Sequence, residues 1–280
     1  MEFSTKVETT AGNIGIVHTN RILLLGSCFT DNIGQRMLAG GFEATVNPWG
    51  ALYNPMSILD ALTRPDDEFC RWSQRVPDQQ PQPESYNLLI LTFGTAWVYR
   101  LRETGRIVAN CKKQPATLFS RQRLAVGEIV DAYARYIDRH VMPCNQKLLL
   151  TVSPIRHQSD GMHANQLSKA ILLMAADNLC NRYPDHVAYF PAYEIMMDEL
   201  RDYRFYADDM LHPSPMAVEY IWQRFSATYC SKHTLALVHE FEKLNRTLAH
   251  RPLDAGNPEY QTLKSATEQR IKQLKYAIQN

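Results

Sequence analysis

The sequence has no apolar run long enough to cross a membrane. A membrane-spanning helix needs ~20 consecutive apolar residues, and no apolar stretch in these 280 residues approaches that length. The segment Met1–Thr10 has acidic residues where a secretory signal has basic ones, and no apolar signal core follows it. We therefore expect a soluble, cytoplasmic protein that has no membrane partner.

The sequence also has almost no net charge. Its formal charge is +1, and acidic and basic residues are mixed along the chain. Proteins that bind nucleic acid through its phosphates carry clustered positive charge, so this balance gives no electrostatic reason to expect a nucleic acid partner. With 45% hydrophobic residues the composition is that of an ordinary globular protein. The expected partner is a small molecule or a sugar-like chain.

Paired cysteines are absent as well. The sequence contains no C-x-x-C pair, and no histidines cluster with cysteines at the spacing of metal ligands. The six cysteines are Cys28, Cys70, Cys111, Cys144, Cys180 and Cys230. Their scatter indicates reduced thiols, and the sequence predicts neither a metal nor an organic cofactor.

What the chain does have is an alternation of apolar strands and helical patterns. Continuous apolar runs are typical of parallel strands that helices cover on both faces. Such runs occupy residues 21–26, 43–47, 86–94, 147–153 and 186–193. Between them, residues 54–62, 126–137 and 166–175 place apolar side chains at helical spacing. This order predicts an α/β fold, a three-layer α/β/α sandwich around a doubly wound, mostly parallel sheet.

Two segments depart from this alternation. Residues 97–109 have period-two residues on both sides of a glycine turn, which predicts an inserted β-hairpin that overhangs one edge of the sheet. From residue 233 to 280 the pattern is helical, with a break at Arg251-Pro252 and Gly256-Asn-Pro258. We therefore expect an α/β domain over residues 1–232 and a helical C-terminal extension over 233–280. The extension would pack on the domain or on a second copy, so a monomer and a homodimer both remain open.

Residues suited to acyl transfer stand at two turns of this fold. The first apolar run ends in Gly26-Ser27, where a hydroxyl would lie at the sheet edge beside the N-terminus of a helix. Asp209 and His212 lie three positions apart before another helix, so one turn presents a base and the group that orients it. Serine, histidine and aspartate together favour acyl transfer. The ordinary alternatives are a tight turn at Ser27, and Asp209 as a helix cap with His212 packed beside it.

The motif Gly26-Ser-Cys-Phe29 resembles the signature of the GSCFA family, and the layout around it is similar to the wider SGNH/GDSL hydrolase superfamily. Residues 47–55, 92–99, 153–157 and 208–214 fit the same family. The resemblance covers roughly residues 15 to 230. It implies a flavodoxin-like, mostly parallel five-stranded sheet, with Ser27 as the nucleophile, His212 as the general base, and Asp209 holding the imidazole in the useful tautomer.

The same resemblance implies an oxyanion hole in which one of the usual donors is replaced. Hydrolases of this kind use the backbone N–H of the nucleophile, a glycine N–H, for which Gly50 is the candidate, and an asparagine of a Gly-x-Asn block. Here the corresponding block reads Gly94-Thr-Ala, without the asparagine. Because losing such a donor costs ~10²–10³ in rate, Thr95 or Asn54 would have to replace it.

Cys28 adjoins Ser27, and a thiolate is intrinsically the better nucleophile. A Cys-His-Asp enzyme is therefore conceivable. Because neighbouring side chains diverge at such a turn, we expect the Cys28 thiol to point away from Ser27 and toward the core, as a structural thiol.

Arg156 and His157 follow the apolar run 147–153 and should emerge at the same sheet edge as Ser27. They would bind a carboxylate or hydroxyl of the substrate, and His157 could assist the oxyanion. Alternatively, Arg156 pairs with a local acid such as Asp160, and His157 packs in its loop.

Together these residues predict a serine esterase that hydrolyses a small acyl ester, with an O-acetyl group on a saccharide as the favoured substrate. Aromatic residues that flank the expected site in sequence suit stacking on a sugar, although they equally suit packing. Two alternatives remain open. One is an O-acyltransferase that acts on a saccharide, and the other is a catalytically silent carbohydrate-binding protein.

Overall fold

The centre of the molecule is a five-stranded parallel sheet. A computed structural model describes residues 5–250 and 257–279, without the side chain of residue 160. The strands are β1 (Arg21–Gly26), β2 (Glu43–Val46), β3 (Leu88–Phe93), β7 (Lys147–Val152) and β8 (Val187–Phe190). Their order across the sheet is β2-β1-β3-β7-β8, and every neighbouring pair is parallel. The carboxyl ends of the strands therefore meet at one edge.

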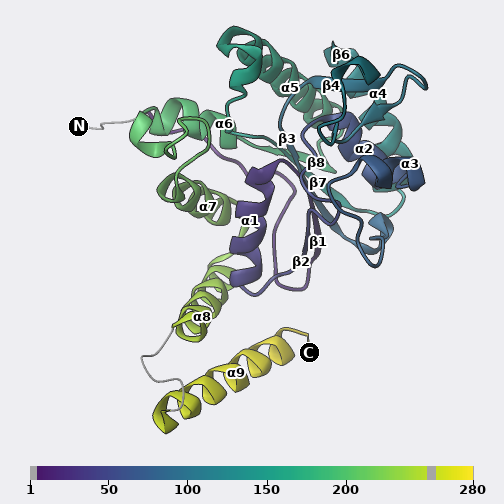
Figure 1. Cartoon of the computed structure of the whole chain (residues 1–280). Coiled ribbons are helices and arrows are strands. Elements are labelled where there is room, and N and C mark those ends of the chain that lie inside the picture. The colour runs from purple at the N-terminus through teal and green to yellow at the C-terminus, as the bar shows by residue number, and fades with distance from the viewer. Residues whose placement is uncertain (1–4, 251–256, 280) are drawn as a thin grey trace.

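Helices cover both faces of this sheet, as the continuous apolar runs predict. Along β1, Ile22 and Leu24 belong to one hydrophobic core, while Leu23 and Leu25 belong to the other. The first core includes side chains of α1 (Cys28–Ala39), α7 (Pro215–Tyr229) and α8 (Lys232–Ala249), and the second includes those of α2 (Pro55–Thr63), α4 (Val126–Tyr136) and α5 (Met162–Arg182). Figure 1 shows α1 and α7 on one side of the sheet and α2 and α4 on the other. The predicted three-layer α/β/α fold is confirmed.

A smaller antiparallel sheet follows β3. It has the order β5-β4-β6, with β4 (Trp97–Leu101) pairing with both β5 (Ile107–Val108) and β6 (Phe119–Arg123). A local core joins Phe119 and Val108 to Trp72 at the end of α3 (Asp67–Trp72). The sequence predicts the β4–β5 hairpin region but not the third strand, because β6 has the polar sequence Phe-Ser-Arg-Gln-Arg.

The C-terminal part consists of α8 and α9 (Pro258–Gln279), which pack against each other. Arg270 of α9 pairs with Glu240 of α8, and the buried side chains of α9 are Thr267 and Leu274. The predicted helix break at Arg251-Pro252 lies outside the described residues. The division into a domain at 1–232 and an extension at 233–280 stays a prediction. In the described ranges, no helix is both long and apolar enough to span a bilayer.

The remaining helical elements are short. They are η1 (Pro83–Ser85), η2 (Ala116–Leu118), η3 (Ile137–Val141), η4 (Gln158–Asp160), α6 (Ala192–Glu194), η5 (Ile195–Leu200) and η6 (Tyr203–Phe205).

A buried carboxylate, that of Glu199, binds the N-terminal segment to the α/β domain through Lys6 and Val7. Glu199 of η5 accepts hydrogen bonds from Tyr220, Arg224 and Lys6, and from the backbone N–H of Val7. Burial alone would raise the pKa of Glu199, but these donors outweigh it and hold the pKa at about 2. The carboxylate is therefore ionised at all ordinary pH values.

Candidate active site

The turn from β1 into α1 lies at the carboxyl edge of the sheet. Gly26 has a φ of +153°, and a Cβ on it would lie 2.4 Å from the carbonyl oxygen of Thr92, so glycine is required there. Ser27 is the N-cap of α1 and is only 1% exposed. Its Oγ accepts from the backbone N–H of Phe29 at 3.3 Å and donates to Ser153 Oγ at 3.0 Å. The Ser27 hydroxyl is thus directed into the sheet edge.

Cys28 is the first residue of α1, and its half-buried thiol packs against the hydrophobic core that α1 shares with α7. Its Sγ lies 3.6 Å from His212 Nε2. The thiol lies against this core, as predicted, and it also contacts His212, which the sequence does not predict. The N-cap hydroxyl of Ser27 turns back onto the helix N–H groups, so Cys28 and not Ser27 makes this contact.

His212 and Asp209 lie together in a short turn before α7. His212 Nδ1 and Asp209 Oδ2 are 2.5 Å apart, while Asp209 Oδ1 accepts from the backbone N–H groups of Leu211 and His212. These hydrogen bonds lower the pKa of Asp209 to about 2, and the one from the backbone N–H of His212 has the largest effect. The N-cap of α7 is Ser214, so the structure does not support the alternative that Asp209 caps this helix.

Three groups therefore form a continuous series from thiol to imidazole to carboxylate. In the described part of the chain, no hydrogen bond joins Ser27 Oγ to His212. The order of Cys28, His212 and Asp209 is that of a nucleophile, its base and the group that orients the base. Of the two candidate nucleophiles, the structure places Cys28 within reach of the imidazole.

The thiol of Cys28 needs a base to react. Burial raises its pKa above the ordinary value, and the N–H groups of Cys28 and Phe29 at the helix N-terminus lower it by less. The thiol is consequently protonated near neutral pH. An imidazole at 3.6 Å is placed to accept that proton during attack.

Two of the predicted oxyanion groups already have partners. The backbone N–H of Gly50 donates to Asn47 O at 2.8 Å and closes a turn in which Gly50 has a φ of +81°. The side chain of Asn54 caps α2, where it accepts from the N–H of Ser57 and donates to Ser57 Oγ.

Gly94 and Thr95 are similarly engaged. Both backbone N–H groups donate to the carbonyl of Tyr53, at 2.9 and 2.8 Å. The Thr95 hydroxyl lies 3.1 Å from Ser168 Oγ and accepts from the N–H of Trp97. Gly94 nevertheless lies beside the turn, since a Cβ on it would come within 3.5 Å of Ser27 Cβ. The oxyanion roles of these residues stay predictions.

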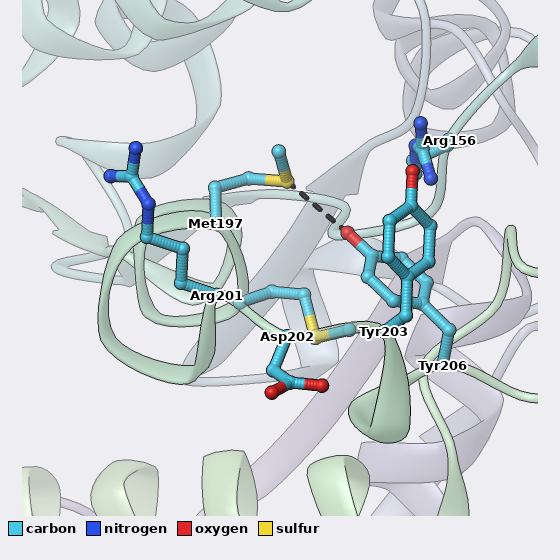
Figure 2. A pocket seen from close by; sticks show the side chains of 7 residues that line it. Arg156, Met197, Arg201, Asp202, Tyr203 and Tyr206 are labelled. Atoms are coloured by element: carbon cyan, nitrogen blue, oxygen red, sulfur yellow. Dashed lines mark hydrogen bonds between the residues drawn. The ribbon is translucent and has the colours of Figure 1, made fainter. Parts of the chain in front are cut away.

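Arg156 holds the turn that carries His212. Its backbone N–H donates to Leu211 O and its guanidinium to Met210 O, each at 3.1 Å. The guanidinium also lies over the rings of Tyr203 and Tyr206. Arg156 lines a cavity of about 160 Å³. Figure 2 shows its lining residues, among which the Tyr206 hydroxyl donates to the sulfur of Met197. The side chain of Asp160, the alternative partner of Arg156, lies outside the described residues.

A second cavity, of about 320 Å³, lies beside the small sheet, and its lining residue Thr95 directly follows Gly94. His157 lines it, while the backbone N–H of His157 donates to Asn165 Oδ1. Its walls include Tyr53, Thr95, Trp97, Tyr99, Asn110 and Arg121. We call this space the aromatic cavity.

The sequence does not predict a role for two buried residues near the turn that contains Ser27. Ser153 receives the Ser27 hydrogen bond, and Lys169 of α5 donates to Ser153 O and Gly94 O at 2.7 Å each. A signal for Lys169 was present, because it lies three positions before the buried Leu172 on the same helix face, where a charge is unusual.

The chain matches the model of the GSCFA family over residues 21–69 and 66–225. No curated protein matches it significantly. Among solved structures, a protein from Bacteroides fragilis described as an acylhydrolase is 10% identical, with a TM-score of 0.46 over 80% of this chain and 91% of that one.

Two esterases give similar values. A variant of an acetyl-xylooligosaccharide esterase from Geobacillus is 10% identical, with a TM-score of 0.45 over 78% of this chain and 96% of that one. A family 2 carbohydrate esterase with a carbohydrate-binding domain, from Corynascus thermopiles, is 12% identical, with a TM-score of 0.45 over 80% of this chain and 68% of that one.

Proposed function

Because this chain belongs to the GSCFA family, and because a thiol, an imidazole and a carboxylate lie in series at its sheet edge, we propose that it is an ester hydrolase with Cys28 as its nucleophile. The observation that carries the proposal is the 3.6 Å contact between Cys28 Sγ and His212 Nε2. His212 is the general base, and Asp209 holds its Nδ1 proton.

The reaction has two halves. In the first, the Cys28 sulfur bonds to the acyl carbon while its proton passes to His212 Nε2. The tetrahedral intermediate collapses to a thioester, and the alkoxide leaves with the proton from His212. In the second, water attacks the thioester, His212 takes a proton from this water and returns it to sulfur, and the carboxylic acid is released.

Negative charge on the acyl oxygen needs a donor in both halves. The N-terminus of α1 supplies the backbone N–H of Cys28 together with the positive end of a 12-residue helix. Gly50 and Thr95 would contribute only after their present hydrogen bonds break. We therefore expect modest rates unless the substrate rearranges these loops.

The favoured substrate is a small acyl ester, such as an O-acetyl group, on a saccharide. The aromatic cavity supports this assignment, since Tyr53, Trp97 and Tyr99 line a space large enough for a sugar ring. If the cavity is the saccharide site, Trp97→Ala should raise KM about tenfold for an acetylated oligosaccharide, the equivalent of ~1.4 kcal/mol. KM for p-nitrophenyl acetate should stay unchanged.

The test of the nucleophile is p-nitrophenyl acetate hydrolysis by the wild type and by single variants, with mass spectrometry of trapped acyl-enzyme. We expect Cys28→Ala and His212→Ala to lose ~10³-fold or more in kcat, and the adduct to map to Cys28. Ser27→Ala should keep its activity per folded molecule. Cys180→Ala, which removes another half-buried thiol, is the matched control.

Other outcomes would redirect the assignment. An adduct on Ser27, with full activity in Cys28→Ala, would establish the serine esterase instead. Acyl transfer to an added saccharide in preference to water would identify an O-acyltransferase. Saccharide binding without turnover in any variant would indicate a silent binding protein.

A further inference from the structure

Lys169 is a buried cation directly beneath the proposed site. Its side chain lies on α5 and is 1% exposed. No ion pair among the described residues includes it, although a buried charge without a counter-charge is costly. Its Nζ instead donates to two carbonyl oxygens, those of Gly94 and Ser153, at 2.7 Å each.

These two carbonyls belong to residues that lie beside the turn from β1 into α1, which contains Ser27 and Cys28. Gly94 follows β3, and its Cα faces Ser27. Ser153 follows β7, and its hydroxyl accepts the Ser27 hydrogen bond. The two hydrogen bonds therefore fix the position of Nζ relative to the turn from which the thiol of Cys28 projects.

The pKa of Lys169 and the pKa of Cys28 influence each other. Burial lowers the pKa of Lys169 to about 7, and a thiolate on Cys28 would raise it again. Conversely, the Lys169 ammonium lowers the pKa of Cys28, against the larger effect of burial. Each of the two charged forms therefore favours the other.

We propose that Lys169 is a positioning residue whose buried ammonium stabilises the negative charge that forms on the Cys28 sulfur. The proposal rests on the proposed function, because it gives the charge a role in activating that nucleophile. The other titratable groups near the pair are His212 from its turn, Asp31 from α1, Tyr53 from its loop and Tyr193 from α6. Asp31 opposes Lys169, since its carboxylate disfavours the thiolate.

The test is the rate of Cys28 alkylation by iodoacetamide across pH, followed by mass spectrometry of the Cys28 peptide. Near pH 7, Lys169→Met should react about tenfold more slowly than the wild type, because an opposite charge shifts a pKa by ~1 unit or more. At high pH the two rates should converge, since both thiols are then ionised. Lys169→Arg should restore part of the rate, and Lys147→Met, at a distant strand end, should change nothing.

Equal alkylation rates of the wild type and Lys169→Met at high pH would distinguish an electrostatic role of Lys169 from a structural one. A distorted site would alter the alkylation rate at every pH and would overturn the proposal, as would equal rates near neutrality. The readout is thiol titration and not turnover, so an absence of esterase activity would defeat the proposed function while leaving this result intact.

If Lys169→Met does not fold, a second measurement uses folded proteins only. In protein labelled with carbon-13 at lysine Cε, Lys169 is the signal expected to titrate near neutrality. In the wild type we expect the chemical shift of the Lys169 Cε signal to change a second time, at the pH at which the Cys28 thiol ionises. In Cys28→Ser we expect only the change near neutral pH. Identical titrations in the two proteins would refute the coupling.

Discussion

Replacing Ser27 by alanine separates its structural role from a chemical one. The substitution removes the N-cap acceptor of α1, which costs ~1 kcal/mol. It also removes the donor to the buried Ser153 hydroxyl, which costs another ~1 kcal/mol. No space is created beyond one oxygen atom. We therefore expect the free energy of unfolding of Ser27→Ala to fall by about 2 kcal/mol in total.

Urea unfolding measures this loss. The midpoint should decrease without a change in slope, because the substitution exposes no new surface on unfolding. In thermal unfolding the same loss corresponds to ~4–8 °C for a chain of this size. Ser153→Ala and the double variant complete a cycle, and the coupling energy should be ~1 kcal/mol if the Ser27–Ser153 hydrogen bond is formed.

One result would refute this reasoning. If Ser27→Ala unfolds at the wild-type urea concentration but forms no acyl adduct, then the Ser27 hydroxyl contributes to the chemistry and not to the helix cap.

Three further predictions concern other parts of the structure. Asp209→Asn should lower kcat by ~10³-fold or more, because the imidazole of His212 loses its anionic partner, while circular dichroism stays unchanged; full activity would contradict the assignment. Glu199 has a pKa of about 2 against an ordinary 4.5, so it stabilises the fold above pH 4.5 and ceases to do so as pH falls toward 2. The stability of Glu199→Gln, from urea midpoints, should therefore lie ~3 kcal/mol below the wild type at pH 7 and approach it toward pH 2; a pH-independent difference would argue against a charge effect. Gly26→Ala should lose ~3 kcal/mol or more, because its Cβ would meet the Thr92 carbonyl; a soluble protein with the wild-type melting temperature would show that the turn relaxes.

The strands could be predicted from sequence because their signal is local. Continuous apolar runs at 21–26 and 147–153 correspond to β1 and β7 almost residue for residue. Strand β6 escaped prediction because its residues 119–123 are mostly exposed and polar. Its place in the small sheet follows from pairing with β4, which depends on contacts distant in sequence.

The candidate site could be predicted in part for the same reason. The three-residue spacing of Asp209 and His212 correctly indicates that they lie together, since one turn contains both. The contact between Cys28 and His212 could not be predicted, because it depends on how Ser27 caps its helix and bonds Ser153 across the sheet edge. Lys169 was overlooked because its burial depends on the strand ends that surround it.

The strand order has a consequence for how the chain is made. Each new strand joins an edge that already exists, since β2 pairs with β1, β3 with the other side of β1, β7 with β3 and β8 with β7. No strand has to insert between two that are already paired. The sheet can therefore grow during synthesis, in the order in which the ribosome releases the strands. His212 follows all of them in the sequence, so the Cys28 thiol of a nascent chain meets the imidazole of His212 only after the strands have been synthesised.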